Sequence, residues 1–247
     1  MAYTINRFDM QDNATTTVVD GTGVSGAGPV ADATLVPGGS HTTADISVTG
    51  PGVLPRALKL SAASNDVITG LGLRGEDSDG CGLAFWFKSS STSNCVLFRS
   101  DSGGGIDSVK IAGGKMVITD DNPGSVTLDL PGVTLTNWNH FGFITYLNPG
   151  GGDDMFLEFY INGAISGTAQ NVTSFESAVS WRMDQAGKTS NGADVSLAGV
   201  AFNQRVDIAW DASTIAALYA YRGSPGSESA LSPSLQATLS PSLAGAV

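Results

Sequence analysis

Histidine and glutamate often serve as catalytic bases, and both are sparse in this chain. The sequence of 247 residues contains 2 histidines, His41 and His140, and its glutamates stand apart at positions 76, 158, 176 and 228. Glycoside hydrolysis needs two carboxyl groups about 5–9.5 Å apart across the scissile bond. No two glutamates are spaced to meet on one strand. Glu158 lies between aromatic residues, and we expect it on the solvent face of a strand.

Other catalytic signatures are also missing from the sequence. It contains no Gly-x-Ser-x-Gly segment, and we expect His140 to be a packed or edge residue of a strand. Two histidines and two separated cysteines do not make a zinc ligand set. Gly21-Thr-Gly23-Val-Ser-Gly26 matches the dinucleotide-binding G-x-G-x-x-G pattern, but Pro29 and Pro37 leave little room for the helix that this pattern must open. We therefore expect a loop at residues 21–26. Taken together, the missing signatures predict that the protein is not an enzyme.

Short strands between turn residues make up most of the chain. Strand patterns recur about every 8–12 residues, a spacing typical of β-sandwiches and barrels. The clearest is 156–161, where Leu157, Phe159 and Ile161 share one face. Asn162-Gly163 follows directly, and this dipeptide favours a type I′ hairpin turn because both residues tolerate positive φ. The sequence therefore predicts an all-β fold.

One short helix and an extended tail end the chain. Asp211 can cap a helix over 212–220, and Gly223-Ser224-Pro225 stops it. Beyond it, residues 224–247 contain no aromatic residue and repeat Leu-Ser-Pro-Ser-Leu. Proline and serine favour an extended tail, so we expect its leucines to contact a partner. These leucines are Leu231, Leu235, Leu239 and Leu243.

The composition excludes several classes of protein. The formal net charge is −11 and no basic stripe is present, which argues against nucleic-acid binding. No stretch has the length of a membrane span or the pattern of a signal peptide. Cys81 and Cys95 flank a predicted hairpin, 83–88 with 96–99. A disulfide would need another pairing, so we expect two free buried thiols.

Segments in order along the chain resemble a known family. They are PGVLPRALKLSAASNDVIT at 51–69, LAFWFK at 83–88, WNHFGFITY at 138–146, FLEFYING at 156–163, and the strand with helix at 197–219. Together they resemble the laminin-G-like branch of the concanavalin A-like lectin and glucanase superfamily. The resemblance implies a two-sheet antiparallel jelly-roll sandwich over 51–223. Residues 1–50 then form an N-terminal arm and edge strands, and 224–247 the Ser/Pro/Leu tail.

The resemblance also implies candidate sites. The superfamily's glucanases carry Glu-x-Asp-x-Glu on one strand, which this chain lacks. Laminin-G-like modules often bind calcium in rim loops through oxygen ligands. The candidates here are Asp153 with Asp154 and Asp120 with Asp121, although acidic turn residues can equally be solvated turns. Exposed tryptophans could form a sugar platform, and Trp181 and Trp210 are the candidates, with burial as the alternative.

These observations favour a structural protein over a catalyst. We expect a virion protein, either a bacteriophage capsid decoration or fibre subunit, that displays the jelly roll and attaches through its terminal arms. Its partners would be other virion proteins or sister subunits in a homo-oligomer. The alternative is an extracellular carbohydrate-binding or adhesion module that recognises cell-surface glycans, with calcium as its possible cofactor.

Overall fold

A computed structural model describes most of the chain. The described residues are 6–8, 18–19, 21–22, 24–25, 28–29, 33–42, 47–51, 54, 56–75, 81–91, 94–100, 106–120, 124–147, 155–171, 181–187, 193–203 and 210–220. The tail leucines, the loop with Asp153 and Asp154, and Asp121 lie outside these residues. Asp120 and Trp181 are described only as strand residues, without their side chains.

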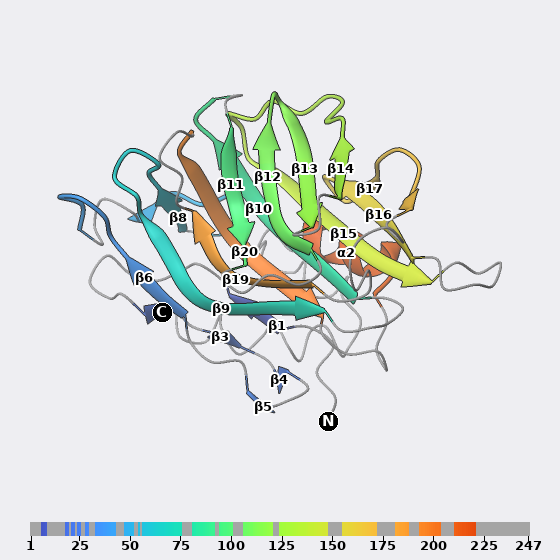
Figure 1. Ribbon diagram of the computed structural model, residues 1–247, viewed down its shortest axis with the longest axis horizontal. Helices are drawn as coiled ribbons and strands as arrows, with labels where there is room; N and C mark the ends of the chain where they lie inside the picture. The colour runs from blue at the N-terminus through green and yellow to red at the C-terminus, as the bar shows by residue number, and fades with distance from the viewer. Residues whose placement is uncertain are drawn as a thin grey trace.

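The described residues form two large β-sheets that pack face to face (Figure 1). Sheet A has ten strands and sheet B has eight, and β4 (Val24–Ser25) pairs only with β5 (Gly28–Pro29). The strands of sheet A are β1 (Asn6–Phe8), β3 (Gly21–Thr22), β7 (Ser47–Val48), β8 (Ala57–Leu60), β10 (Cys81–Ser89), β15 (Asn139–Leu147), β16 (Met155–Ile161), β17 (Ala164–Ile165), β18 (Gln170–Asn171) and β20 (Val195–Asn203). The strands of sheet B are β2 (Val18–Val19), β6 (Ala33–Val36), β9 (Val67–Gly75), β11 (Cys95–Arg99), β12 (Ile106–Ala112), β13 (Lys115–Asp120), β14 (Ser125–Leu128) and β19 (Trp181–Gly187).

The pairing confirms the expected antiparallel sandwich. Sheet A runs β17-β16-β15-β10-β20-β1-β3, with β8 also paired to β20, and sheet B runs β14-β13-β12-β11-β19-β9-β6-β2. Every pairing is antiparallel except a single parallel bridge between Ile106 and Trp181. The short N-terminal strands extend both sheets, since β1 pairs with β20 and β6 pairs with β9. Among the described residues, no helix is both long and apolar enough to cross a bilayer.

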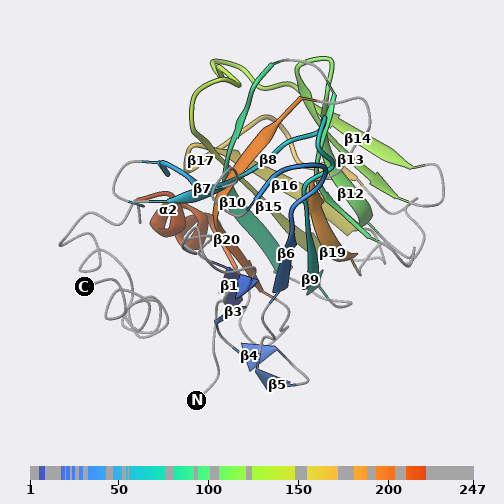
Figure 2. The same ribbon diagram turned by 90° about the vertical axis from the view of Figure 1, so that its left-hand side faces the viewer.

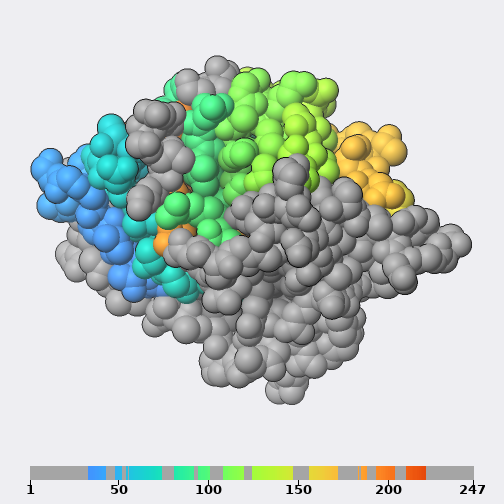
Figure 3. Space-filling model, viewed as in Figure 1, coloured from blue at the N-terminus to red at the C-terminus, as the bar shows by residue number. Residues whose placement is uncertain are grey.

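The main core lies between the sheets and follows from strand alternation. In β10, Leu83, Phe85 and Phe87 point inward and are fully buried. In β16, Leu157 and Phe159 point inward, as the sequence predicts. The Phe85 ring packs edge-on against Phe98 of sheet B, with centroids 4.8 Å apart. This interlocking of aromatic side chains joins the two layers, while the outer sides of β12 and β13 lie at the surface (Figure 3).

The predicted helix is confirmed as α2 (Ala212–Ala220) and lies on the outer side of sheet A (Figure 2). Asp211 caps it, because its Oδ1 accepts the Thr214 N–H at 2.8 Å. Ile215 and Leu218 are buried against the sheet together with Trp210. Figure 2 shows the helix, sheet A and sheet B as three successive layers.

The predicted Asn162-Gly163 turn is confirmed and also supports the helix. Both residues have positive φ, 51° and 81°. The Asn162 N–H donates to the His140 carbonyl at 2.7 Å, and the Asn162 side-chain oxygen accepts the His140 N–H at 2.9 Å. A Cβ at Gly163 would lie 2.6 Å from Cδ1 of Tyr219. The turn is therefore the surface on which the Tyr219 ring rests.

The predicted hairpin between 83–88 and 96–99 is wrong. Strand β10 pairs with β15 and β20 in sheet A, whereas β11 pairs with β12 and β19 in sheet B. The connection after Ser89 therefore crosses from sheet A to sheet B. Strands β10 and β11 face each other across the core, where both bury phenylalanines. Cys81 and Cys95 are buried thiols that are not joined in a disulfide, as expected. Burial raises the pKa of the Cys95 thiol, which keeps that thiol protonated.

Candidate functional site

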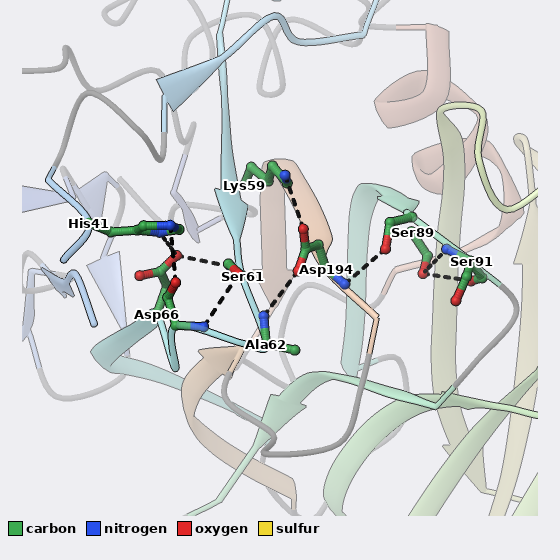
Figure 4. A network of polar contacts seen from close by, with 10 residues as sticks. His41, Lys59, Ser61, Ala62, Asp66, Ser89, Ser91 and Asp194 are labelled. Carbon is green, nitrogen blue, oxygen red and sulfur yellow. Dashed lines mark hydrogen bonds and ion pairs between the residues drawn. The ribbon is translucent and has the colours of Figure 1, made fainter. Parts of the chain in front are cut away.

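A continuous polar network lies at one end of the sandwich, where loops join the sheets (Figure 4). It comprises residues 38–41 after β6, the turn 61–66 between β8 and β9, and residues 89–91 and 194 beside β10 and β20. Figure 4 shows His41 and Asp66 at one side, Ser61, Lys59 and Asp194 beyond them, and Ser89 at the other. We call this set the rim network.

Asp66 is the buried anchor of the rim network. Its side chain is 0% exposed, and it accepts the Gly38 N–H at 2.8 Å, the Ser61 N–H at 3.0 Å and the His41 Nδ1 at 2.9 Å. These hydrogen bonds satisfy the carboxylate oxygens of a side chain that water cannot reach. Asp66 therefore fixes His41 and the loop that carries it against the β8–β9 turn.

The other ring nitrogen of His41 faces a hydroxyl. Ser64 Oγ lies 3.0 Å from His41 Nε2. Since Nδ1 faces the Asp66 carboxylate, we assign the ring proton to Nδ1 and the acceptor role to Nε2. Both Ser64 and His41 are half-buried, and the His41 side chain is 31% exposed. The turn thus presents a hydroxyl in contact with an imidazole nitrogen at the surface.

Asp194 holds the middle of the rim network. Its carboxylate lies 3.0 Å from Lys59 Nζ and accepts the Ala62 N–H at 3.2 Å. Partial burial alone would raise the pKa of Asp194, but the Lys59 ammonium and the Ala62 N–H together hold it below its ordinary value. Lys59 is therefore neutralised by a carboxylate that stays ionised.

A row of polar and aromatic residues crosses the outer face of sheet A beside this network. Lys59 of β8 is in register with Ser196 of β20, and Ser196 is in register with Lys88 of β10. The Lys88 ammonium lies over the ring of Trp138, 5.3 Å from the centroid. We call Lys59, Ser196, Lys88 and Trp138 the outer-face row. Trp138 and Lys88 are both half-buried, so each keeps surface that a ligand can reach.

An aromatic cluster supports the outer-face row from one side. The Trp86 ring stacks on Tyr219 of α2 with centroids 5.4 Å apart, and it contacts His140 at 5.1 Å. Trp86 is 4% exposed and His140 is 1% exposed. The expectation that His140 is a packed residue is therefore confirmed. The cluster fixes the position of the sheet surface on which Trp138 and Lys88 lie.

The structure brings few of the sequence-predicted site residues together. Trp210 is 4% exposed and packs beneath α2, which argues against a sugar platform there because a sugar needs an exposed ring face. Glu158 is half-buried on the outer face of β16, beside the Tyr160 hydroxyl. Among the described residues, no three His, Cys, Asp or Glu side chains could hold one metal ion. The calcium candidates and Trp181 lie outside the described side chains and stay predictions.

Sequence reasoning missed the residues that the fold does bring together. His41, Ser64 and Asp66 come from two loops, and Lys59, Lys88 and Trp138 come from different segments. A partial signal was present, because the lysines occupy the polar positions of otherwise apolar strands, ALKL and LAFWFK. Such positions face away from a sandwich core.

No protein-family model and no curated protein sequence matches this chain. Its structure is similar to receptor-binding domains of botulinum neurotoxins. The serotype D binding domain is 14% identical, with a TM-score of 0.56 over 90% of this chain and 52% of that chain. The type G receptor-binding domain is 13% identical, with a TM-score of 0.54 over 89% and 51%.

A further similar structure is the serotype D ligand-binding domain in complex with N-acetylneuraminic acid. It is 14% identical, with a TM-score of 0.52 over 77% of this chain and 46% of that chain. This chain therefore spans about half the length of these domains. At such identities the likeness shows the fold alone, which is the expected two-sheet antiparallel jelly roll.

Proposed function

We propose that this chain is a glycan-binding module that holds an acidic sugar against Trp138 and Lys88. The observation that carries the proposal is the Lys88 ammonium, 5.3 Å from the Trp138 centroid on the outer face of sheet A. An aromatic ring can pack against the apolar face of a sugar ring, and a neighbouring ammonium can bind a sugar carboxylate. The proposal follows the carbohydrate-binding alternative that the sequence offered.

The charges of the described residues support Lys88 as the carboxylate-binding group. Lys59 lies 3.0 Å from Asp194, and Lys115 lies 2.8 Å from Asp129. Among the described residues, no carboxylate lies within salt-bridge distance of Lys88. Its ammonium is therefore the one in the outer-face row whose charge a ligand can neutralise. In a chain of net charge −11, such a local cation gives an anionic ligand a defined place to bind.

The solved neighbour that contains N-acetylneuraminic acid supports an acidic sugar as the ligand class. This chain matches 46% of that domain. The position proposed for the ligand therefore rests on Lys88 and Trp138 and not on the position of the sugar in that complex. One ring contact adds about 0.5–1.5 kcal/mol and one charged hydrogen bond about 1.5–3 kcal/mol. A dissociation constant on the order of 1 mM is therefore expected for one sugar. Clustering of several modules on a surface would raise the apparent affinity.

The test compares sialyllactose with lactose by saturation-transfer NMR and titration of the full chain. We expect sialyllactose to bind, and Lys88→Ala and Trp138→Ala each to weaken binding about 10-fold, as loss of about 1.4 kcal/mol requires. Lys115→Ala is the control, because it removes another lysine side chain that reaches the surface, but on β13 of sheet B. A glycan array probed with and without a calcium chelator shows whether the predicted calcium is needed. No binding in either condition would contradict the proposal.

A virion subunit is the other function that the sequence predicts. It rests on the composition and on Leu231, Leu235, Leu239 and Leu243 in the repeated tail, which lie outside the described residues. The similar solved structures add no support for a virion origin, for sister-subunit contacts or for an attachment face. A glycan-binding module and a virion subunit would both display the jelly roll outside a cell. We therefore propose an extracellular or surface location.

A further inference from the structure

Ser64, His41 and Asp66 form the arrangement of an activated nucleophile. Ser64 Oγ lies 3.0 Å from His41 Nε2, and His41 Nδ1 lies 2.9 Å from Asp66 Oδ2. Acyl-transfer enzymes use the same three groups in the same contacts: a nucleophile, a base, and a carboxylate that orients the base. This arrangement is recognised by its geometry and not by the order of the residues in the sequence. We infer that Ser64 is a nucleophile that transfers small acyl groups from esters to water.

The carboxylate of this arrangement is rigidly held. Asp66 is fully buried, and besides His41 it accepts the backbone N–H groups of Gly38 and Ser61. A carboxylate fixed in this way holds the imidazole in one tautomer and stabilises the imidazolium that forms during proton transfer. Gly38 is required for this geometry, because a Cβ at that position would overlap the Ser64 carbonyl oxygen.

The reacting hydroxyl lies on an open part of the rim. Ser64 is half-buried, its turn neighbours Ala63 and Asn65 are exposed, and Gly39 passes beside its Cβ. The His41 N–H closes a turn onto the Gly38 carbonyl at 3.0 Å. The N–H groups of the central turn residues Gly39 and Ser40 are not used by that closing bond. Such backbone N–H groups are the donors that stabilise the oxyanion of acyl transfer.

The surroundings of Ser64 favour a short acyl group. In the described part of the chain, its neighbours are Ala63 and Asn65 in the turn and Gly38 and Gly39 on the facing loop, and none of these has a long apolar side chain. An acetyl ester of an alcohol, a class that includes O-acetylated sugars, is therefore the substrate class that fits. The inference does not depend on the proposed glycan site, because the outer-face row contains none of these residues.

The reaction proceeds in two balanced steps. Ser64 Oγ bonds to the ester carbonyl carbon while its proton moves to His41 Nε2. The bond to the alcohol oxygen then breaks, and the alcohol leaves with that proton. Water attacks the acetyl-serine, gives one proton to His41 Nε2 and displaces Ser64 Oγ, which takes the proton back. The products are acetic acid and the alcohol, and the general-base contribution is expected to be about 10²–10⁴-fold.

The test is labelling of the full chain with a fluorophosphonate probe, followed by peptide mass spectrometry. We expect the label on Ser64, its loss in Ser64→Ala, and at least a 10-fold slower labelling in His41→Gln. Ser125→Ala is the matched control, because Ser125 is an exposed serine on β14 and belongs neither to the rim network nor to the outer-face row, and it should label as the unchanged chain does. Melting curves show that each variant is folded.

Hydrolysis of 4-nitrophenyl acetate gives a second readout. An exposed imidazole hydrolyses this ester slowly by itself, so activity counts only where Ser64→Ala lowers it. Absence of label on Ser64 in the folded chain, or equal labelling in His41→Gln, would overturn the inference. Loss of labelling together with intact sialyllactose binding separates this site from the proposed glycan site.

Discussion

The outer face of sheet A has two parts that differ in what covers them. Beneath α2, the strands carry small residues, Gly82, Ala84, Gly142 and Ala201, and a Cβ at Gly82 would overlap the Trp210 ring. Beside the helix, the outer-face row carries Lys88 and Ser196 on two of the same strands, β10 and β20, and Trp138 directly before β15. Small residues let a helix approach the sheet, and long amphipathic ones leave a surface for a ligand. Side-chain size along one strand thus separates the covered part from the open part.

Two tryptophan substitutions test this difference most strongly. Trp210→Ala removes a buried ring from beneath α2, and we expect it to lower the free energy of unfolding by about 3–5 kcal/mol. Trp138→Ala removes a half-buried ring from the outer-face row, and we expect a loss of about 1 kcal/mol. Urea denaturation at neutral pH measures both. Equal losses would mean that the two parts are packed alike.

A pair of glycines gives a finer test within the covered part. Gly82→Ala places a methyl group against the Trp210 ring, which cannot move far, so a loss of about 1–3 kcal/mol is expected. At Gly142 the new methyl group would lie 3.0 Å from Cδ1 of Ile215, the flexible end of a side chain. Gly142→Ala should therefore change stability by less than about 1 kcal/mol. Thermal melts of the two variants distinguish them, and a larger effect at Gly142 would contradict the packing.

The start of α2 gives the smallest effect and a dependence on pH. Hydrogen bonds from the Ser213 hydroxyl and from Thr214 hold the pKa of Asp211 below its ordinary value of 3.8. The capping carboxylate therefore stabilises the fold above pH 3.8, and this contribution is lost as the pH falls through the lower folded-state pKa. Asp211→Ala should cost about 1 kcal/mol at neutral pH.

The control for that prediction is Asp211→Asn, which keeps a capping oxygen but does not titrate. Its stability relative to the unchanged chain should vary with pH only below pH 3.8. Urea denaturation of the three proteins from pH 7 to pH 3 measures this difference. A constant difference across that range would show that the carboxylate does not act as a charged cap.

Local patterns were enough to predict the elements that depend on nearby residues. The inward positions of 156–161, the turn at Asn162-Gly163 and the helix capped by Asp211 all rest on residues within a few positions of each other. The hairpin between 83–88 and 96–99 failed because a short connection can either turn back within a sheet or cross to the other one. Nothing near residue 90 distinguishes these outcomes; the choice depends on distant strands β15 and β20.

The candidate sites could not be predicted because their residues meet only through the fold. His41 and Ser64 are 23 positions apart in the chain, and neither lies in a catalytic motif. Lys88 and Trp138 meet because β10 pairs with β15. The tryptophan that sequence reasoning considered free, Trp210, is buried because α2 folds back over it. Exposure of a side chain is a property of the assembled layers and is only weakly encoded by its neighbours in sequence.

The contact between Gly163 and Tyr219 has a consequence for how such chains can diverge. Any larger residue at position 163 would collide with the Tyr219 ring, 2.6 Å from the site of a Cβ, and would also be strained by the positive φ. Evolution could replace this glycine only after the tyrosine had become smaller and the hairpin had changed its turn. These positions should therefore covary in descendants of this chain, so that divergence at the helix end is recorded in the distant hairpin.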